Sequence, residues 1–167
     1  WKRNKQVFDD KIAELKLFHF TIADQLFSSS SHPVFHQLNE VFQTLESRYK
    51  EEIPDNYNYE YDQIVSLGEI ISTLIVEAYI TTSGFSSKWM DARRLIRTNN
   101  TFRDAEVDWK RTEELICTTV LPAFDQTDII ITQGFIGHTP ELLTTTLGRE
   151  GSDFTAGIFA YCLNAEN

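Results

Sequence analysis

The sequence predicts an α/β fold whose first section is helical. Two patterns support this: apolar residues in the first half recur at helical spacing, whereas strands and helices alternate in the second half. The best strand, Ile129–Ile131, is a continuous β-branched run, which is typical of a strand buried on both faces of a parallel sheet. The chain has 167 residues, of which 41% are hydrophobic, so we expect about one domain with a true core.

The first section, residues 1–56, is predicted to be a helical hairpin. A helix over residues 5–27 would place one apolar face on Phe8, Ile12, Leu15, Phe18, Ile22 and Leu26. The segment "SSSSHP" at residues 28–33 breaks it. A second helix over residues 34–51 would use Val34, Leu38, Val41, Phe42 and Leu45, and "IPDNYNYEYD" at residues 53–62 would then turn the chain.

The second section, residues 57–167, alternates helices and strands. A third helix contains "IISTLIVEAYI" and stops near Gly84, and "SSKWMDA" has the short apolar centre of a strand. Residues 95–108 are polar and predict a loop. A helix over residues 109–124 is broken at Pro122, and the last helix begins near Ser152.

The net charge of −10 argues against a nucleic-acid-binding surface. The longest apolar run contains Glu77 and falls short of the roughly 20 residues of a membrane span, so no membrane partner is expected. Cys117 and Cys162 are expected to be reduced thiols, which suits a cytoplasmic protein. The scattered histidines show no metal-ligand spacing, so no metal site is predicted among these residues, and His138 is interpreted as a solvated loop residue.

The segment "TTTLGREGSDF", residues 144–154, combines hydroxyls, glycines, an arginine and an aspartate. A strand followed by a glycine-rich loop and a helix is a geometry that binds anions, and Arg149 can pair with a carboxylate in a bidentate manner. It lacks the G-K-[ST] of a Walker A loop. The alternative is a tight structural turn with Ser152 or Asp153 as the N-cap of the last helix.

A second motif, "SLGE" at Ser66–Glu69, also has two readings. Ser-x-x-Glu before an apolar run is a capping box that begins a helix. Alternatively, Glu69 is a buried anion that receives a cationic ligand group such as an ammonium.

Several strings in their order resemble the aspartokinases of the amino-acid kinase family. They are "SLGEIISTLIVEAYI", "KWMDARRLIRTNNTFRDAEVDW" and "ITQGFIGHTPELLTTTLGREGSDFTAGIFAYCLNA", which together cover about residues 60 to 165. The departures from the family pattern are Glu150, Phe154 and the "PELL" loop. The resemblance implies a partial three-layer αβα sandwich of the carbamate kinase-like type.

The resemblance also implies an activity, the transfer of the ATP γ-phosphoryl group to the side-chain carboxylate of L-aspartate. Catalytic roles would fall to Arg149 and Asp153, the latter orienting a phosphate-binding lysine. Glu69, Phe135, Arg149 and Ser152 would bind aspartate. The residues near the transferred phosphoryl group would be Thr144, Thr145, Thr146, Gly148 and Gly151.

The family resemblance further implies ATP and Mg²⁺ as cofactors, and a homo-oligomer for the full-length enzyme. The family's K-F-G-G-T-S loop is absent from this sequence. We therefore expect residues 1–167 to be one incomplete domain, the central part of the catalytic domain, and to be inactive in isolation. The alternatives are another amino-acid kinase, acting on glutamate, acetylglutamate or a nucleotide, and a non-catalytic amino-acid-binding or helical interaction module.

Overall fold

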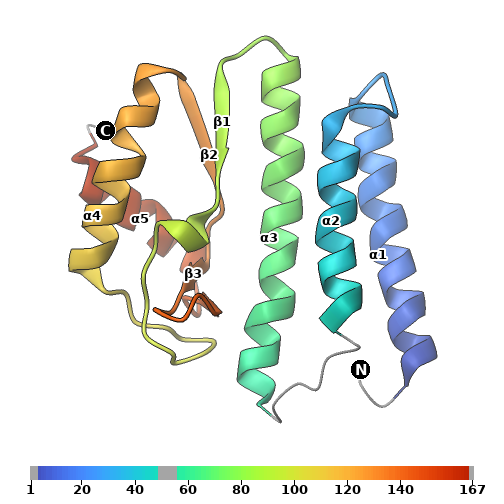
Figure 1. The fold of residues 1–167 in the computed structure, drawn as a ribbon, viewed down its shortest axis with the longest axis horizontal. Helices are drawn as coiled ribbons and strands as arrows, with labels where there is room; N and C mark the ends of the chain where they lie inside the picture. Colours follow the sequence, from blue (N-terminus) through green and yellow to red (C-terminus); the bar gives the residue numbers. More distant parts are fainter. Residues whose placement is uncertain (1–3, 49–55, 166–167) are drawn as a thin grey trace. The chain divides into compact units, whose positions relative to one another are not determined.

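The computed structural model describes residues 4–48 and 56–165 of the chain (Figure 1). It contains two compact units, Trp1–Pro54 and Asp55–Asn167. The predicted division after residue 56 therefore lies within two residues of the observed one. That the two units make up a single incomplete domain remains a prediction.

The first unit is the predicted helical hairpin. Helix α1 (Lys5–Leu26) packs against α2 (Pro33–Arg48). The predicted face of α2 is largely confirmed, because Val34, Leu38, Phe42 and Leu45 are buried while Val41 is half-buried. Residues 49–51 of the predicted second helix lie outside the described residues.

The predicted apolar face of α1 is only partly right. Phe8 and Ile12 are buried, but Leu15 and Phe18 are 46% and 60% exposed. Ala23 and Phe27 are buried instead. Because α2 is the one helix that packs on α1 within this unit, only a narrow stripe of α1 can be covered.

The second unit begins with α3 (Tyr57–Thr82), which starts earlier than expected. Asn56 is its N-cap, and the Asn56 side chain accepts a hydrogen bond from the Tyr59 amide at 3.1 Å. The predicted turn over residues 53–62 is therefore wrong from Tyr57 onward. Asparagine is a strong N-cap residue, and this signal outweighs the turn-like composition of the segment.

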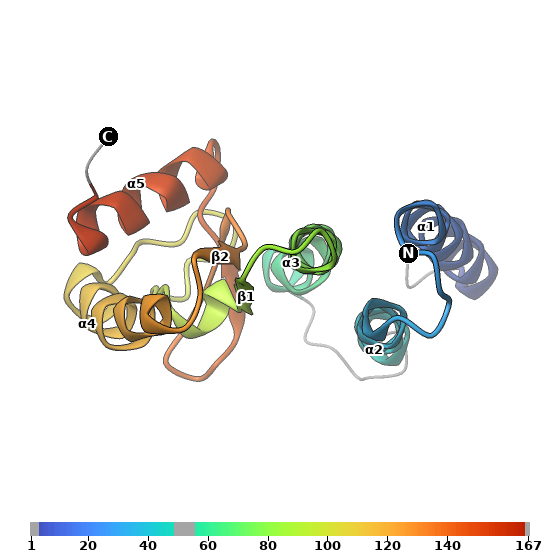
Figure 2. The same ribbon diagram turned by 90° about the horizontal axis from the view of Figure 1, so that it is seen from above.

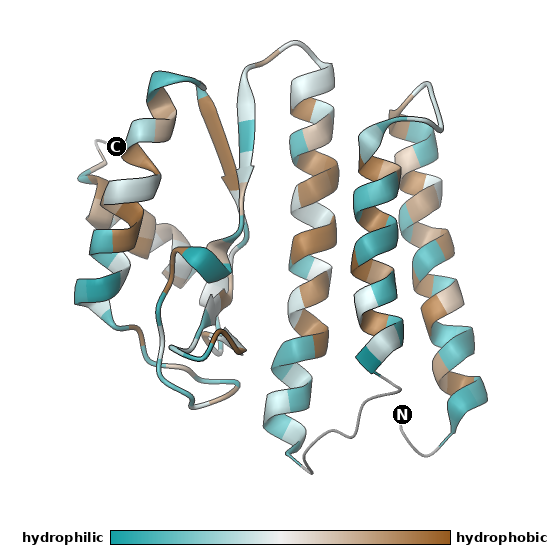
Figure 3. Ribbon diagram, viewed as in Figure 1, coloured by the Kyte–Doolittle hydropathy of each residue, from teal (hydrophilic) through white to brown (hydrophobic). Residues whose placement is uncertain are grey.

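By length and composition alone, α3 could also cross a membrane. Its first turns are hydrophilic and its later turns carry most of its apolar residues (Figure 3). The apolar residues Ile70, Ile71, Leu74, Ile75 and Ala78 are buried, and α3 packs on strands β1 and β2. This packing is that of a core helix in a globular unit.

A βαβ unit follows α3. Strand β1 (Ser87–Met90) leads through a 3₁₀ turn (Ala92–Arg94) and a loop to α4 (Trp109–Thr119), and a second 3₁₀ turn (Leu121–Asp125) containing Pro122 precedes β2 (Ile129–Thr132). The strands pair in parallel, with Ser87 opposite Ile129 and Met90 opposite Thr132. Both strands and the helix break at Pro122 were predicted and are confirmed.

The elements of this unit form the expected three layers. The β1–β2 sheet lies between α3 on one face and α4 with α5 on the other (Figure 2). The four residues of β2 are half-buried, however, so the expected full burial of this strand is wrong for the described residues. A sheet of two strands is too narrow for its covering helices to shield both faces completely.

The chain ends with a short antiparallel pair and a helix. Strands β3 (Ile136–His138) and β4 (Thr144–Thr146) pair with Ile136 opposite Thr146, and α5 (Gly151–Leu163) follows β4. The core between the sheet, α4 and α5 contains Met90, Leu95, Ile96, Ile116, Val120, Ala123, Leu147, Ile158 and Cys162. Both cysteines are free, as expected.

Candidate functional site

The loop between β4 and α5 turns through two residues with positive φ. Gly148 has φ 76°, a backbone conformation that favours glycine, and a Cβ there would lie 2.5 Å from Asp104 Oδ1. Glu150 has φ 58° and is the N-cap of α5, without a side-chain capping bond. The alternative in which Ser152 or Asp153 caps the helix is therefore wrong, because both residues already lie within its first turn.

Phe135 is fixed between this loop and α5. Its φ is 71°, its carbonyl accepts from the Leu147 amide at 2.9 Å, and its own amide donates to Thr155 Oγ1 at 3.0 Å. A Cβ on Gly151 would lie 2.6 Å from the Phe135 ring. The strained backbone at Phe135 is therefore held by partners on both sides. The structure thus brings together Phe135, Gly151 and the first turn of α5.

Three predicted polar residues of this loop and helix face solvent. The side chain of Arg149 is 93% exposed and lies 3.7 Å from the Glu150 carboxylate through its Nε. Ser152 and Asp153 are also exposed. Arg149 is consequently free to change rotamer and meet an anion without breaking a buried contact.

Glu69 lies in the middle of α3, far from the N-cap Asn56, so the capping-box reading of Ser66 and Glu69 is wrong. Glu69 is half-buried, and this burial raises the pKa of its carboxyl group above the ordinary value. Within the described part of the chain it has no ion pair. A bound ammonium would stabilise the ionised form of this desolvated carboxylate.

Glu69 is tied to the end of β2 through Thr73. Thr73 Oγ1 donates to the Glu69 carbonyl at 2.8 Å and accepts from Gln133 Nε2 at 2.9 Å and Trp89 Nε1 at 3.0 Å. Gln133 is fully buried, and its Oε1 accepts from the Ala92 amide at 2.8 Å. This network places the turn of α3 that carries Glu69 beside the β2–β3 turn that carries Phe135.

The three threonines of β4 are buried. Thr146 Oγ1 donates to Asp62 Oδ1 at 2.8 Å, and Thr145 Oγ1 lies 2.7 Å from Thr98 Oγ1. The backbone of Thr144 pairs with the Gln63 carboxamide. At least Thr145 and Thr146 thus hold β4 in place, and their proximity to a phosphoryl group remains a prediction.

Asp62 and Gln63 are not among the site residues that the sequence predicts. Asp62 is 0% exposed and accepts three hydrogen bonds. Burial raises the pKa of Asp62, although these hydrogen bonds act in the opposite direction. No local signal pointed to it, because it lies in the polar "NYNYEYD" segment that was interpreted as a turn.

His138 is not the solvated loop residue that was expected. It lies in β3 and is 3% exposed. Burial, together with the nearby Arg97 and Arg93 charges, lowers its pKa to about 4, against smaller opposing effects of the Ile96 backbone and Asp91. His138 is therefore neutral at physiological pH.

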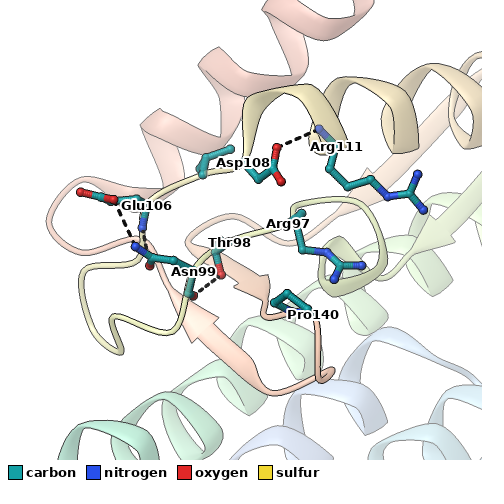
Figure 4. A pocket seen from close by; sticks show the side chains of 8 residues that line it. Arg97, Thr98, Asn99, Glu106, Asp108, Arg111 and Pro140 are labelled. Atoms are coloured by element: carbon teal, nitrogen blue, oxygen red, sulfur yellow. Dashed lines mark hydrogen bonds between the residues drawn. The ribbon is translucent and has the colours of Figure 1, made fainter.

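Two pockets border these elements. One of about 420 Å³ lies between β2 and α5 and is bounded by Gly134, Ser152, Thr155 and mainly apolar side chains. The other, of about 570 Å³, is lined by residues that include Arg97, Asn99, Glu106, Asp108 and Arg111 (Figure 4). Both acidic residues of this pocket accept hydrogen bonds from the chain itself. Glu106 accepts from the Asn99 side chain, and Asp108 accepts from the Arg111 amide. Neither pocket contains Glu69 or Arg149, so neither by itself is the predicted aspartate site.

Within residues 4–48 and 56–165, no group of three or more histidine, cysteine, aspartate or glutamate side chains is placed to hold a metal ion.

The family model for the amino acid kinase family matches residues 19–167. The chain belongs to the amino acid kinase family. The match includes the α3 helix, the βαβ unit and the β4–α5 loop, so it covers every element of the candidate site.

The relatives with similar sequences are aspartokinases. The chain is 41% identical to the lysine-sensitive aspartokinase 3 of Escherichia coli over 104 residues, which are 62% of this chain and 23% of that protein. It is 29% identical to the aspartokinase of Chlamydia trachomatis over 157 residues, covering 94% of this chain and 33% of the relative. The sequence resemblance to aspartokinases is thereby confirmed.

Solved structures of aspartokinases are similar to this chain as well. The structure of E. coli aspartokinase III in complex with aspartate and ADP matches with a TM-score of 0.86 and 29% identity, over 97% of this chain and 36% of that one. The aspartate kinase of Clostridium acetobutylicum matches with a TM-score of 0.70 and 22% identity, which supports the fold. The chain thus spans between 23% and 36% of the length of these proteins.

Proposed function

We propose that this chain is the aspartate-binding part of an aspartate kinase. The observation that carries the proposal is Glu69, a half-buried carboxylate without an ion pair in the described residues, on a helix fastened to the turn that carries Phe135. A carboxylate in this state suits a substrate ammonium. The similarity to an aspartokinase that holds aspartate and ADP supports the same substrate.

In this proposal, Arg149 binds the α-carboxylate of L-aspartate, and Ser152 and the Phe135 backbone complete the pocket. The side-chain carboxylate of the substrate attacks the γ-phosphorus of ATP, and ADP leaves with the bridging oxygen. Because the nucleophile is ionised at neutral pH, no general base is needed, and catalysis depends on positioning and charge neutralisation. Asp153 orients a phosphate-binding lysine supplied from elsewhere in the enzyme.

The phosphates would lie near Thr144, Thr145, Thr146, Gly148 and Gly151, where backbone amides of the loop that follows β4 can donate to them. Their location beside the N-terminus of α5 supports this part of the proposal, because helix N-termini favour anions. ATP would arrive with Mg²⁺, which neutralises the phosphate charge. We also propose that the complete enzyme is a homo-oligomer and is located in the cytoplasm.

A substrate panel on the complete enzyme tests this function. ADP release would be followed with L-aspartate, L-glutamate or N-acetylglutamate as acceptor, and with no acceptor. We expect turnover that depends on L-aspartate. Turnover with glutamate or acetylglutamate alone would make the protein a different amino-acid kinase. Aspartate binding by calorimetry without turnover would make it a non-catalytic binding module.

A further inference from the structure

A buried carboxylate on α3 holds strand β4, which leads into the β4–α5 loop that carries Arg149 (the Arg149 loop, residues 147–150). Asp62 Oδ2 accepts from the amides of Thr146 and Arg103, each at 2.9 Å, and Asp62 Oδ1 accepts from the Thr146 hydroxyl at 2.8 Å. We call Asp62 with these three donors the Asp62 clamp. The next residue, Gln63, donates to the Thr144 carbonyl at 2.6 Å and accepts from the Thr144 amide at 3.3 Å.

These contacts replace a neighbouring strand. One edge of β4 pairs with β3, and the amides of Thr144 and Thr146 are satisfied on the other edge by side chains of α3. A helix that bonds the backbone of a strand in this way is locked to it in register. A buried carboxylate that accepts from two amides and a hydroxyl is a strong and directional fastening.

The Asp62 clamp also fixes the loop that contains Arg103 and Asp104, which packs against Gly148. Arg103 has φ 74°, a strained conformation for a side-chain-bearing residue, and its amide is held by Asp62. The neighbouring Asp104 occupies the space that a Cβ on Gly148 would need, with its Oδ1 2.5 Å from that position. Asp62 therefore supports Gly148 from two directions, through β4 and through the 103–104 loop, and Arg149 is the next residue.

Glu69 projects from α3 about two helical turns after Asp62. Seven residues are 20° short of two full turns, so the two carboxylates share one face of the helix, about 10 Å apart along its axis. Any slip of α3 along β4 would change the separation between Glu69 and Arg149. We propose that Asp62 is a positioning residue that sets the spacing between the ammonium-binding Glu69 and the carboxylate-binding Arg149.

This inference rests on the proposed function, since it assumes that Glu69 and Arg149 bind the two ends of one amino acid. The substrate offers its ammonium and α-carboxylate at a separation fixed by covalent bonds. The site therefore needs a matching spacing, and a misplacement of about 1 Å can cost on the order of 100-fold in rate. Asp62 touches neither the substrate nor ATP in this arrangement and acts through the two residues it positions.

The test uses the complete enzyme and four variants. Asp62→Ala removes the clamp. Asp62→Asn keeps its shape, because the asparagine oxygen can accept from the two amides while its NH₂ group donates to a rotated Thr146 hydroxyl. Thr146→Val removes the hydroxyl alone. The matched control is Thr112→Val. Thr112 lies on α4 and is also fully buried, and its hydroxyl accepts a hydrogen bond from the Arg97 amide at 3.0 Å.

We expect Asp62→Ala to raise the aspartate KM on the order of 10- to 100-fold, and by a larger factor than the ATP KM. Asp62→Asn should recover most of this loss. Thr146→Val should raise the aspartate KM in the same direction, whereas Thr112→Val should lower the melting temperature to a similar extent with an unchanged aspartate KM. If Asp62→Ala does not fold, the comparison of the aspartate KM between Thr146→Val and Thr112→Val tests the inference instead.

Three results would overturn the inference. Equal aspartate KM values for Thr146→Val and Thr112→Val would reduce the clamp to ordinary stabilisation. A raised ATP KM with an unchanged aspartate KM in Thr146→Val would assign this hydroxyl to the phosphates. Unchanged amide hydrogen exchange of residues 144–150 in Asp62→Ala and Thr146→Val, relative to Thr112→Val, would show that the clamp does not hold the loop.

The exchange measurement does not depend on catalysis. If the wild-type enzyme does not phosphorylate aspartate, the proposed function fails at that step. The exchange experiment then still reports whether Asp62 holds the β4–α5 loop.

Discussion

The carboxamide of Gln133 donates through Nε2 to Thr73 Oγ1 at 2.9 Å and accepts from the Ala92 amide at 2.8 Å. One fully buried side chain therefore links α3, the end of β2 and the 3₁₀ turn after β1. Glu69 and Phe135, which lie on different elements, owe their relative position in part to this link.

The first prediction concerns that link. Gln133→Leu keeps a similar size but leaves the Ala92 amide without its acceptor, so we expect a loss on the order of 2–4 kcal/mol in the free energy of unfolding. Urea denaturation of the chain measures it. Gln126→Leu, at an exposed position, is the control and should change stability little. Equal effects of the two substitutions would contradict a structural role for the Gln133 network.

The second prediction concerns Glu69. Glu69→Gln in the complete enzyme should raise the aspartate KM strongly, because the neutral amide cannot balance the substrate ammonium. The melting temperature should stay the same or rise, since the substitution removes a partly desolvated charge. Glu77→Gln, on the same helix, is the matched control and should leave the aspartate KM unchanged. An unaltered KM in Glu69→Gln would leave this carboxylate without a substrate role.

The third prediction concerns Arg149. A guanidinium can grip a carboxylate through two parallel hydrogen bonds, which lysine cannot reproduce. Arg149→Lys should therefore lower kcat/KM for aspartate by an amount on the order of 2–3 kcal/mol in transition-state free energy, although the charge is kept. Because the side chain is 93% exposed, folding should be unaffected.

Steady-state kinetics with each substrate varied in turn gives this result. Arg94→Lys, another exposed arginine, serves as the control and should behave as wild type. A weaker ATP interaction with normal use of aspartate would mean that Arg149 binds phosphates instead.

The fourth prediction is a pH dependence caused by His138. Its pKa is about 4 in the folded chain and 6.5 in the unfolded one, so between these values the unfolded state binds more protons. Stability should therefore fall as pH drops from about 6.5 toward 4, by an amount on the order of 3 kcal/mol. His138→Asn should remove this part of the pH dependence.

Urea denaturation between pH 4.5 and 7.5 follows the effect. His36→Asn is the control, because the His36 side chain is 79% exposed in α2. If wild type and His138→Asn lost stability in parallel over this range, another group would be responsible.

The kinds of elements and their order could be predicted from local sequence signals. Helical spacing identified α1 and α2, the isoleucine run identified β2, and Pro122 marked the end of α4. These signals are local, since periodicity, β-branching and a missing amide act within a few residues. The motif around Arg149 and the family resemblance could also be recognised in the sequence, because both depend on residue identity at fixed spacing.

The role of each polar residue, in contrast, depends on long-range packing. Ser66 and Glu69 match a capping box in the sequence, but Asn56 begins the helix and leaves both inside it. His138 reads as a loop residue, but its pairing in β3 buries it. Asp62 lies 84 residues from Thr146 along the chain, and no local pattern can reveal that the two form a 2.8 Å hydrogen bond. Burial and long-range partners, which arise when α3 packs on β4, turn an acidic residue of a polar segment into the clamp of the Arg149 loop.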